Sequence, residues 1–126
     1  MYQDSLIRIK NAQAIGKEKI KIPYSEFVFN ILGVLSERKI IGAISKKGKG
    51  VKKIIDVNLL YENGQPIING LKFFSKPSKK VYLSYKDLRP VKQGYGAGII
   101  STPKGIMNSF KARKEKLGGE YLFEIW

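Results

Sequence analysis

The chain has 126 residues, of which 43% are hydrophobic, so it is long enough to bury a core and is not disordered as a whole. Its 24 basic and 10 acidic residues give a net charge of +14, divided evenly between residues 1–75 and 76–126, which indicates a polyanionic partner. Cysteine and histidine are absent, which excludes disulfides, thiolate nucleophiles and most transition-metal sites, so we expect no metal, cofactor or small-molecule substrate.

Residues 4–14 predict an amphipathic helix. Leu6 and Ile9 lie on its apolar side, while Arg8 and Asn11 lie on the opposite, polar face. By pattern alone, a polar face of this kind is a solvated surface.

The next two elements build the core of the N-terminal half. Alternating residues predict a strand over 17–22, which Pro23 ends. Ser25 can cap a helix that runs to about residue 38. That helix carries a wide apolar stripe, so we assign it to the core and give it no binding role.

A lysine–glycine run at residues 46–50 joins two predicted strands over 40–45 and 51–61. Such a run is usually a solvated, mobile loop tip. Because Lys52 and Lys53 follow it directly on a cationic chain, contact with nucleic-acid phosphates is the alternative. That contact would add affinity without reading sequence.

Turn and linker signals divide the rest of the chain. Asn63-Gly64 predicts a tight hairpin that leads into a strand over 66–75. The proline and charges of residues 76–80 predict a linker, because they cannot continue a central strand. The second half then opens on a predicted strand over 81–85.

Aromatic and basic side chains interleave around that strand. The pattern allows bases to stack while phosphates are neutralised. The alternative is one tyrosine in the core and one at the surface. The side chains concerned are Lys79, Lys80, Tyr82, Tyr85 and Lys86.

A polar loop lies between an apolar run at 97–100 and an amphipathic helix that Asn108 can cap. We expect it to connect a buried strand, bounded by Gly94 and Gly96, directly to that helix. Two hydroxyls, a charge and a bare backbone suit a polyanion with hydrogen-bonding groups, although an ordinary polar turn has the same composition. The loop consists of Ser101, Thr102, Pro103, Lys104 and Gly105.

The order of the elements predicts an α+β fold with two small subdomains. Residues 1–75 form a helix-strand-helix-strand-strand-strand unit. We expect residues 76–126 to form a mainly antiparallel β unit with one helix, which Gly118-Gly119 ends before a strand over 121–126. The interleaved aromatic and basic side chains at 79–86 make this the candidate RNA-binding unit.

The C-terminal third resembles the signature of bacterial-type small-subunit ribosomal protein 8. The matching strings are Gly98-Ile-Ile-Ser-Thr-Pro-Lys-Gly-Ile-Met-Asn108, Lys111-Ala-Arg113 and Leu117-Gly-Gly-Glu120. Other parts agree in order, namely Asp4-Ser-Leu-Ile-Arg8-Ile-Lys-Asn11-Ala near the start, and Ser75-Lys-Pro77 followed by Val81-Tyr82. The resemblance covers nearly the whole chain.

The resemblance implies a structural constituent of the small ribosomal subunit that binds the central domain of small-subunit rRNA and supports assembly. Ribosomal protein 5 is the implied protein neighbour, and the implied location is the bacterial cytoplasm, with an organellar ribosome as the alternative.

The resemblance also implies roles for single residues. Ser101 and Thr102 would read base or ribose groups, and Lys104 would neutralise phosphate. Gly105 would allow close approach, and Tyr82 would stack on a base. The remaining implied rRNA-binding residues are Glu120, as an acceptor or a brace of the loop, with Arg8, Asn11, Lys52, Lys53 and Lys80.

Two positions depart from the family pattern. Pro103 stands where the family usually has a serine, which removes one hydroxyl and one backbone donor from the loop. Ser78 stands where a glycine is common. The first change puts one RNA hydrogen bond in doubt, and neither threatens the fold.

Two other function classes are weaker. A nuclease would need histidine or paired carboxylates for acid–base chemistry, and neither is evident, so we expect no enzyme. A non-specific architectural nucleic-acid binder would show no preference for structured RNA. No apolar run approaches the roughly 18 residues of a membrane span and no signal peptide is recognisable, so we expect an intracellular protein without a membrane partner.

Overall fold

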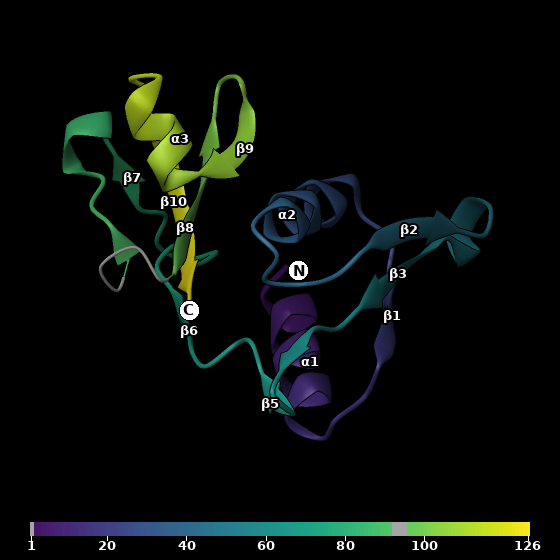
Figure 1. Cartoon of the computed structure of the whole chain (residues 1–126). Helices are drawn as coiled ribbons and strands as arrows, with labels where there is room; N and C mark the ends of the chain where they lie inside the picture. Colours follow the sequence, from purple (N-terminus) through teal and green to yellow (C-terminus); the bar gives the residue numbers. More distant parts are fainter. Residues whose placement is uncertain (1, 92–95) are drawn as a thin grey trace. The chain divides into compact units, whose positions relative to one another are not determined.

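The computed structural model describes residues 2–91 and 96–126, which divide into two compact units spanning Met1–Ile68 and Asn69–Trp126 (Figure 1). Helices and antiparallel strands combine in the chain, which confirms the predicted α+β fold. The sequence places a subdomain boundary after residue 75, and that boundary stays a prediction. Gly94, taken as a strand boundary, lies outside the described residues.

The first unit packs helices against an antiparallel sheet with the strand order β1-β3-β2. Its helix α2 buries Val28, Ile31, Leu32 and Leu35, as the apolar stripe predicts. Ser25 occupies the N-cap position of α2, although its side chain makes no capping hydrogen bond. The elements are α1 (Tyr2–Ala14), β1 (Lys19–Pro23), α2 (Glu26–Glu37), β2 (Ile44–Lys47), β3 (Ile54–Asn58), β4 (Tyr61–Glu62) and β5 (Gln65–Pro66).

The two faces of this sheet differ in chemistry. Ile22 lies opposite Ile55, and both are fully buried. Lys21 lies opposite Asp56 on the other face of the sheet. Lys19 and Lys21 of β1 are exposed to solvent on that face. The period-two alternation of β1 therefore assigns isoleucines to the core and lysines to the surface.

The loop between β2 and β3 corrects the predicted strand over 51–61. Residues Gly50–Lys52 form a 3₁₀ turn, and β3 begins only at Ile54. Gly48 and Gly50 have φ values of +90° and +59°, which a strand cannot accommodate. The strand predicted over 40–45 also shifts, because β2 spans Ile44–Lys47.

The predicted Asn63-Gly64 hairpin is confirmed. Asn63 has φ +53° and Gly64 has φ +76°, the pair of left-handed residues that a type I′ turn requires. The strand expected over 66–75 is interrupted: β5 ends at Pro66, and β6 spans only Leu71–Phe73.

The second unit is an antiparallel sheet with the order β6-β10-β8-β9, and β7 pairs with β10 as well. One face of the sheet carries a core of Leu88, Ile100, Met107, Ala112 and Tyr121, against which Leu83 and Leu117 pack. The helix α3 packs on β8 and β9 (Figure 1). The elements are β6, β7 (Tyr82–Leu83), β8 (Ala97–Thr102), β9 (Gly105–Asn108), α3 (Ser109–Lys114) and β10 (Gly119–Ile125).

The polar loop does not connect a strand to a helix, as the sequence predicted. Instead it is the turn of a hairpin between β8 and β9, with Thr102 opposite Gly105. Asn108 does cap α3, since its side chain accepts a hydrogen bond from the Lys111 amide at 2.9 Å. The second strand was missed because Asn108 is also its last residue, so the strand leads directly into the helix. The helix is also shorter than predicted and ends at Lys114, two residues before Lys116 turns to φ +59°.

Candidate nucleic-acid interface

A row of polar and aromatic side chains crosses β7, β10 and β8. Glu120 lies directly opposite Tyr82 on β7 and directly opposite Ser101 on β8. Because directly opposed residues in antiparallel strands project from the same face, the three side chains stand together on that face. Tyr82 is 66% exposed, which excludes it from the core, and Ser101 and Glu120 are half-buried. We call Tyr82, Glu120 and Ser101 the polar row.

Two glycines allow the strands to approach closely enough to form the polar row. A Cβ atom on Gly119 would collide with the Ser101 carbonyl oxygen, and one on Gly118 would lie 2.6 Å from the Leu83 carbonyl oxygen. The Gly118-Gly119 pair therefore brings β10 against both neighbours at the position where Glu120 follows. The sequence marked this pair only as the end of a helix.

Ser75 holds the carboxylate of Glu120. Its hydroxyl donates to Glu120 Oε2 at 2.5 Å and accepts from the backbone amide of Val81 at 3.1 Å. Ser75 is only 2% exposed, so its end of this bond is buried, while Glu120 is half-buried. Sequence reasoning missed the contact, because nothing in the local pattern around residue 75 points to residue 120.

The turn from Thr102 to Gly105 is braced from within. The Thr102 hydroxyl donates to the Gly105 carbonyl oxygen at 2.8 Å and accepts from the Lys104 amide at 3.2 Å. Thr102 is 8% exposed, whereas Pro103, Lys104 and Gly105 are exposed. Gly105 has φ +120°, a conformation that side chains rarely adopt, and open space where a Cβ would stand. The turn thus presents a lysine and a bare backbone, with Thr102 as its internal support.

The basic segment before β7 is a tight turn in which Lys76 and Lys79 exchange backbone hydrogen bonds of 3.0 Å. Lys80 is exposed at the end of this turn, and only Val81 separates it from β7. Tyr85, in contrast to Tyr82, is half-buried in a short 3₁₀ helix.

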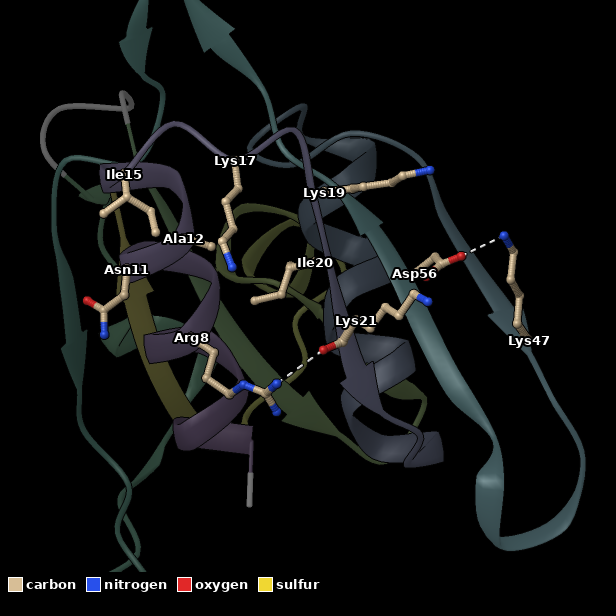
Figure 2. Close-up of a pocket in the computed structure, with 10 residues that line it drawn as sticks. All are labelled: Arg8, Asn11, Ala12, Ile15, Lys17, Lys19, Ile20, Lys21, Lys47 and Asp56. Atoms are coloured by element: carbon tan, nitrogen blue, oxygen red, sulfur yellow. Dashed lines mark hydrogen bonds and ion pairs between the residues drawn. The ribbon is translucent and has the colours of Figure 1, made fainter.

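The other predicted residues belong to the first unit. Arg8 and Asn11 line a cleft of ≈ 840 Å³ between α1 and the sheet (Figure 2). Arg8 Nη2 donates to the Lys21 carbonyl oxygen at 3.3 Å. Four lysines of this cleft, Lys17, Lys19, Lys21 and Lys47, were missed. For Lys19 and Lys21, alternation with isoleucine was the available signal.

An ion pair lies on the sheet side of this cleft. Lys47 Nζ is 2.7 Å from Asp56 Oδ2. The hydrogen bond from Lys47 holds the pKa of Asp56 below its ordinary value against the opposing effect of burial, and the charges of Lys47, Lys21 and Lys19 add to the lowering. Asp56 is thus an anion surrounded by lysines.

Lys52 and Lys53 differ in their surroundings. Lys53 Nζ lies 4.5 Å from the ring centroid of Tyr24, and Lys46 Nζ lies 5.6 Å from the same ring and 5.0 Å from that of Phe29. These distances are within the range of cation–π attraction, so Lys53 contributes to packing. Lys52 is exposed in the 3₁₀ turn.

Over residues 2–91 and 96–126, no group of three or more acidic, histidine or cysteine side chains is placed to hold a metal ion. Within the same described part of the chain, none of the helices has the length and apolar character needed to cross a membrane.

Known proteins resemble this chain over its full length. The family model for ribosomal protein S8 matches residues 1–126. The small ribosomal subunit protein uS8 of Mycoplasma mobile is 43% identical, over 98% of this chain and 92% of that protein. The uS8 proteins of Rippkaea orientalis and Vesicomyosocius okutanii are 42% and 39% identical, over 98% of this chain and 94% of each relative. The chain therefore belongs to the ribosomal protein S8 family.

Proposed function

We propose that the protein is a structural constituent of the small ribosomal subunit in the bacterial cytoplasm, where it binds small-subunit rRNA and serves translation. Membership of the ribosomal protein S8 family supports this role, since rRNA binding is the family's general function. The net charge of +14 supports it independently, because RNA is a polyanion. The role is structural and not enzymatic.

The finer assignment concerns the partners. The protein binds the central domain of the rRNA as a primary binder during assembly, with ribosomal protein 5 as its neighbour. This assignment rests on the resemblance of the strings around Gly98–Asn108 and Leu117–Glu120 to the family signature.

The observation that carries the proposal is the polar row. Tyr82 offers an exposed ring on which an unpaired base can stack. Glu120 is an acceptor only, so it takes a hydrogen bond from a base amino group or a ribose 2′-hydroxyl. Ser101 donates or accepts beside it. Three different hydrogen-bonding and stacking capacities on one face suit irregular RNA better than a uniform duplex.

Charged and backbone groups next to the polar row neutralise and approach the RNA. Lys104 and Lys80 are exposed and contact phosphates. Gly105 leaves its backbone uncovered, which allows an RNA strand to come close. The Thr102 hydroxyl uses its proton and one of its two lone pairs within the turn. One acceptor lone pair remains for RNA, so Thr102 contributes mainly to the stability of the turn.

The first unit adds further contacts. Arg8 and Asn11 approach the RNA from the exposed face of α1. Lys52 reaches a phosphate from the 3₁₀ turn, and Lys53 does so from its position over Tyr24.

A binding assay tests the proposal. We expect the protein to bind a central-domain rRNA fragment more tightly than duplex DNA of equal length, and Tyr82→Ala to weaken that binding by roughly 1–3 kcal/mol. Phe110→Ala is the matched control, since Phe110 is another aromatic side chain of the second unit, 73% exposed and outside the polar row. Equal affinity for the rRNA fragment and duplex DNA would instead indicate a non-specific architectural binder.

A further inference from the structure

The cleft of the first unit carries, beside Arg8 and Asn11, four lysines to which the family resemblance assigns no role. Its cationic side chains come from three elements and the loop between two of them, and one carboxylate lies among the described residues that line it. They are Arg8 on α1, Lys17 before β1, Lys19 and Lys21 on β1, and Lys47 on β2, with Asp56 on β3.

Three of the four lysines of the cleft, Lys19, Lys21 and Lys47, lie on paired strands. Lys19 and Lys21 stand two residues apart on a paired strand, so their Cα atoms are roughly 6.6 Å apart and their ammonium groups can reach different phosphates. Figure 2 shows Lys17 pointing into the space between α1 and β1, while Lys19 and Lys21 extend over β3 towards Asp56. The bond from Arg8 to the Lys21 carbonyl oxygen links α1 to the same strand.

Asp56 keeps this group of lysines together when no ligand is bound. It lies opposite Lys21 in the sheet and pairs with Lys47 at 2.7 Å. A phosphate entering the cleft would offer the lysines a second anion and would compete with Asp56 for Lys47.

The lining indicates which part of a nucleic acid the cleft accepts. Among the residues that the structure describes, no aromatic side chain lines the cleft, so they offer no ring on which a base can stack. The exposed Ile15 and the half-buried Ile20 give it apolar surface, and the Asn11 amide can bond a 2′-hydroxyl. A sugar–phosphate strand matches this combination of cations, an amide and small apolar groups.

We propose that this cleft binds the ribose–phosphate backbone of small-subunit rRNA, as a contact surface of the first unit that adds affinity without reading sequence. The proposal rests on the rRNA-binding role argued above and adds Lys17, Lys19, Lys21 and Lys47 to the residues that perform it. Asp56 acts against binding, because it occupies Lys47 and repels phosphate.

The experiment is a salt series of binding to the central-domain rRNA fragment, with the whole chain. The variant Lys19→Gln/Lys21→Gln is compared with Lys10→Gln/Lys39→Gln, which removes the same charge from exposed positions of the first unit outside the cleft. We expect the slope of log K against log[salt] to become shallower by roughly 1.5 in the cleft variant only, at about 0.7–0.9 per phosphate. A fourfold rise in salt would then weaken its binding about eightfold less than that of the parent.

A second pair of variants tests the opposing role of Asp56. Asp56→Asn is compared with Glu62→Gln, which removes an equal charge from an exposed residue of the β4–β5 hairpin. We expect Asp56→Asn to tighten binding and steepen the slope more than Glu62→Gln does. Circular dichroism establishes whether each variant is folded. If Asp56→Asn does not fold, the Lys19→Gln/Lys21→Gln variant still tests the cleft.

The outcomes separate the two proposals. The cleft proposal is overturned if the Lys19/Lys21 variant keeps the slope of its Lys10/Lys39 control, a result that leaves an acidic protein segment as the occupant. The rRNA-binding role itself is overturned if the parent protein shows no preference for the fragment over duplex DNA. That preference depends on the polar row, so it is read independently of the slope.

Discussion

The Ser75 hydroxyl donates a hydrogen bond of 2.5 Å to the carboxylate of Glu120, across 45 positions of the chain. One carboxylate oxygen is thereby used within the protein, and the orientation of the other is fixed next to Tyr82 and Ser101. A side chain held in one rotamer before binding loses less conformational entropy when RNA arrives.

Removing this hydroxyl should affect both stability and binding. Ser75→Ala leaves the Val81 amide and Glu120 without their buried partner, so we expect unfolding to cost roughly 1–3 kcal/mol less. Glu120→Gln, which still accepts from Ser75, should instead keep stability and weaken rRNA binding. Thermal unfolding and fragment binding of both variants distinguish a bracing role from a contact role. Equal binding by Glu120→Gln and the parent would show that the carboxylate meets no RNA.

Adding one methyl group should have opposite effects at two glycines. Gly119→Ala places a Cβ against the Ser101 carbonyl oxygen, so it should push β8 and β10 apart and destabilise the second unit. Gly33→Ala in α2 meets nothing within 4 Å and should stabilise the first unit by roughly 0.5–1 kcal/mol. Denaturant unfolding measures both. A neutral Gly119→Ala would contradict the close approach of the strands.

The hydroxyl of Thr102 should matter mainly for the turn. Thr102→Val removes both hydrogen bonds of the turn, and we expect a loss of about 1–2 kcal/mol of stability. Thr102→Ser keeps the hydroxyl and should lose much less. Chemical denaturation gives the stabilities, and binding at a temperature where both variants are folded gives the remaining effect on RNA. If Thr102→Ser were destabilised while Thr102→Val kept the stability of the parent, the hydroxyl would not be what stabilises the turn.

Stability should respond to acid through Asp56. Since its pKa is lowered in the folded protein, the stabilisation that the Lys47–Asp56 pair provides is present above the ordinary pKa of an aspartate and is lost as pH falls through the folded pKa. At neutral pH, Asp56→Asn should therefore be less stable than the parent, and the difference should shrink in strong acid. Thermal unfolding over a pH series measures it. A difference that is constant with pH would exclude the ionised carboxylate as its cause.

Local signals in the sequence predicted much of the fold. The Asn63-Gly64 turn needs only two left-handed residues in succession, and the burial of Leu6 and Ile9 follows from helical periodicity. The hairpin between β8 and β9 has no such signal, because Gly105–Asn108 is short and runs straight into the cap of α3. The strand ends near Gly48 and Gly50 were misplaced for a related reason. The positive φ values of these glycines interrupt strand pairing, although the sequence pattern predicts strand on both sides of the lysine–glycine run.

The candidate site was predictable as a set of residues but not as an arrangement. The resemblance supplied Tyr82, Ser101 and Glu120 individually, and register between distant strands places them side by side. Ser75 was not predicted to touch Glu120, because that contact depends on the same long-range register.

The central position of β10 has a consequence for the order in which the protein is made. Synthesis proceeds from the N-terminus, so β7 and β8 leave the ribosome that makes them before Glu120 does. Until β10 has emerged and inserted between them, Tyr82 and Ser101 have no shared neighbour and no common face. A nascent chain therefore carries most of its positive charge before it has the means to select among RNAs, and selection begins only with the last strand.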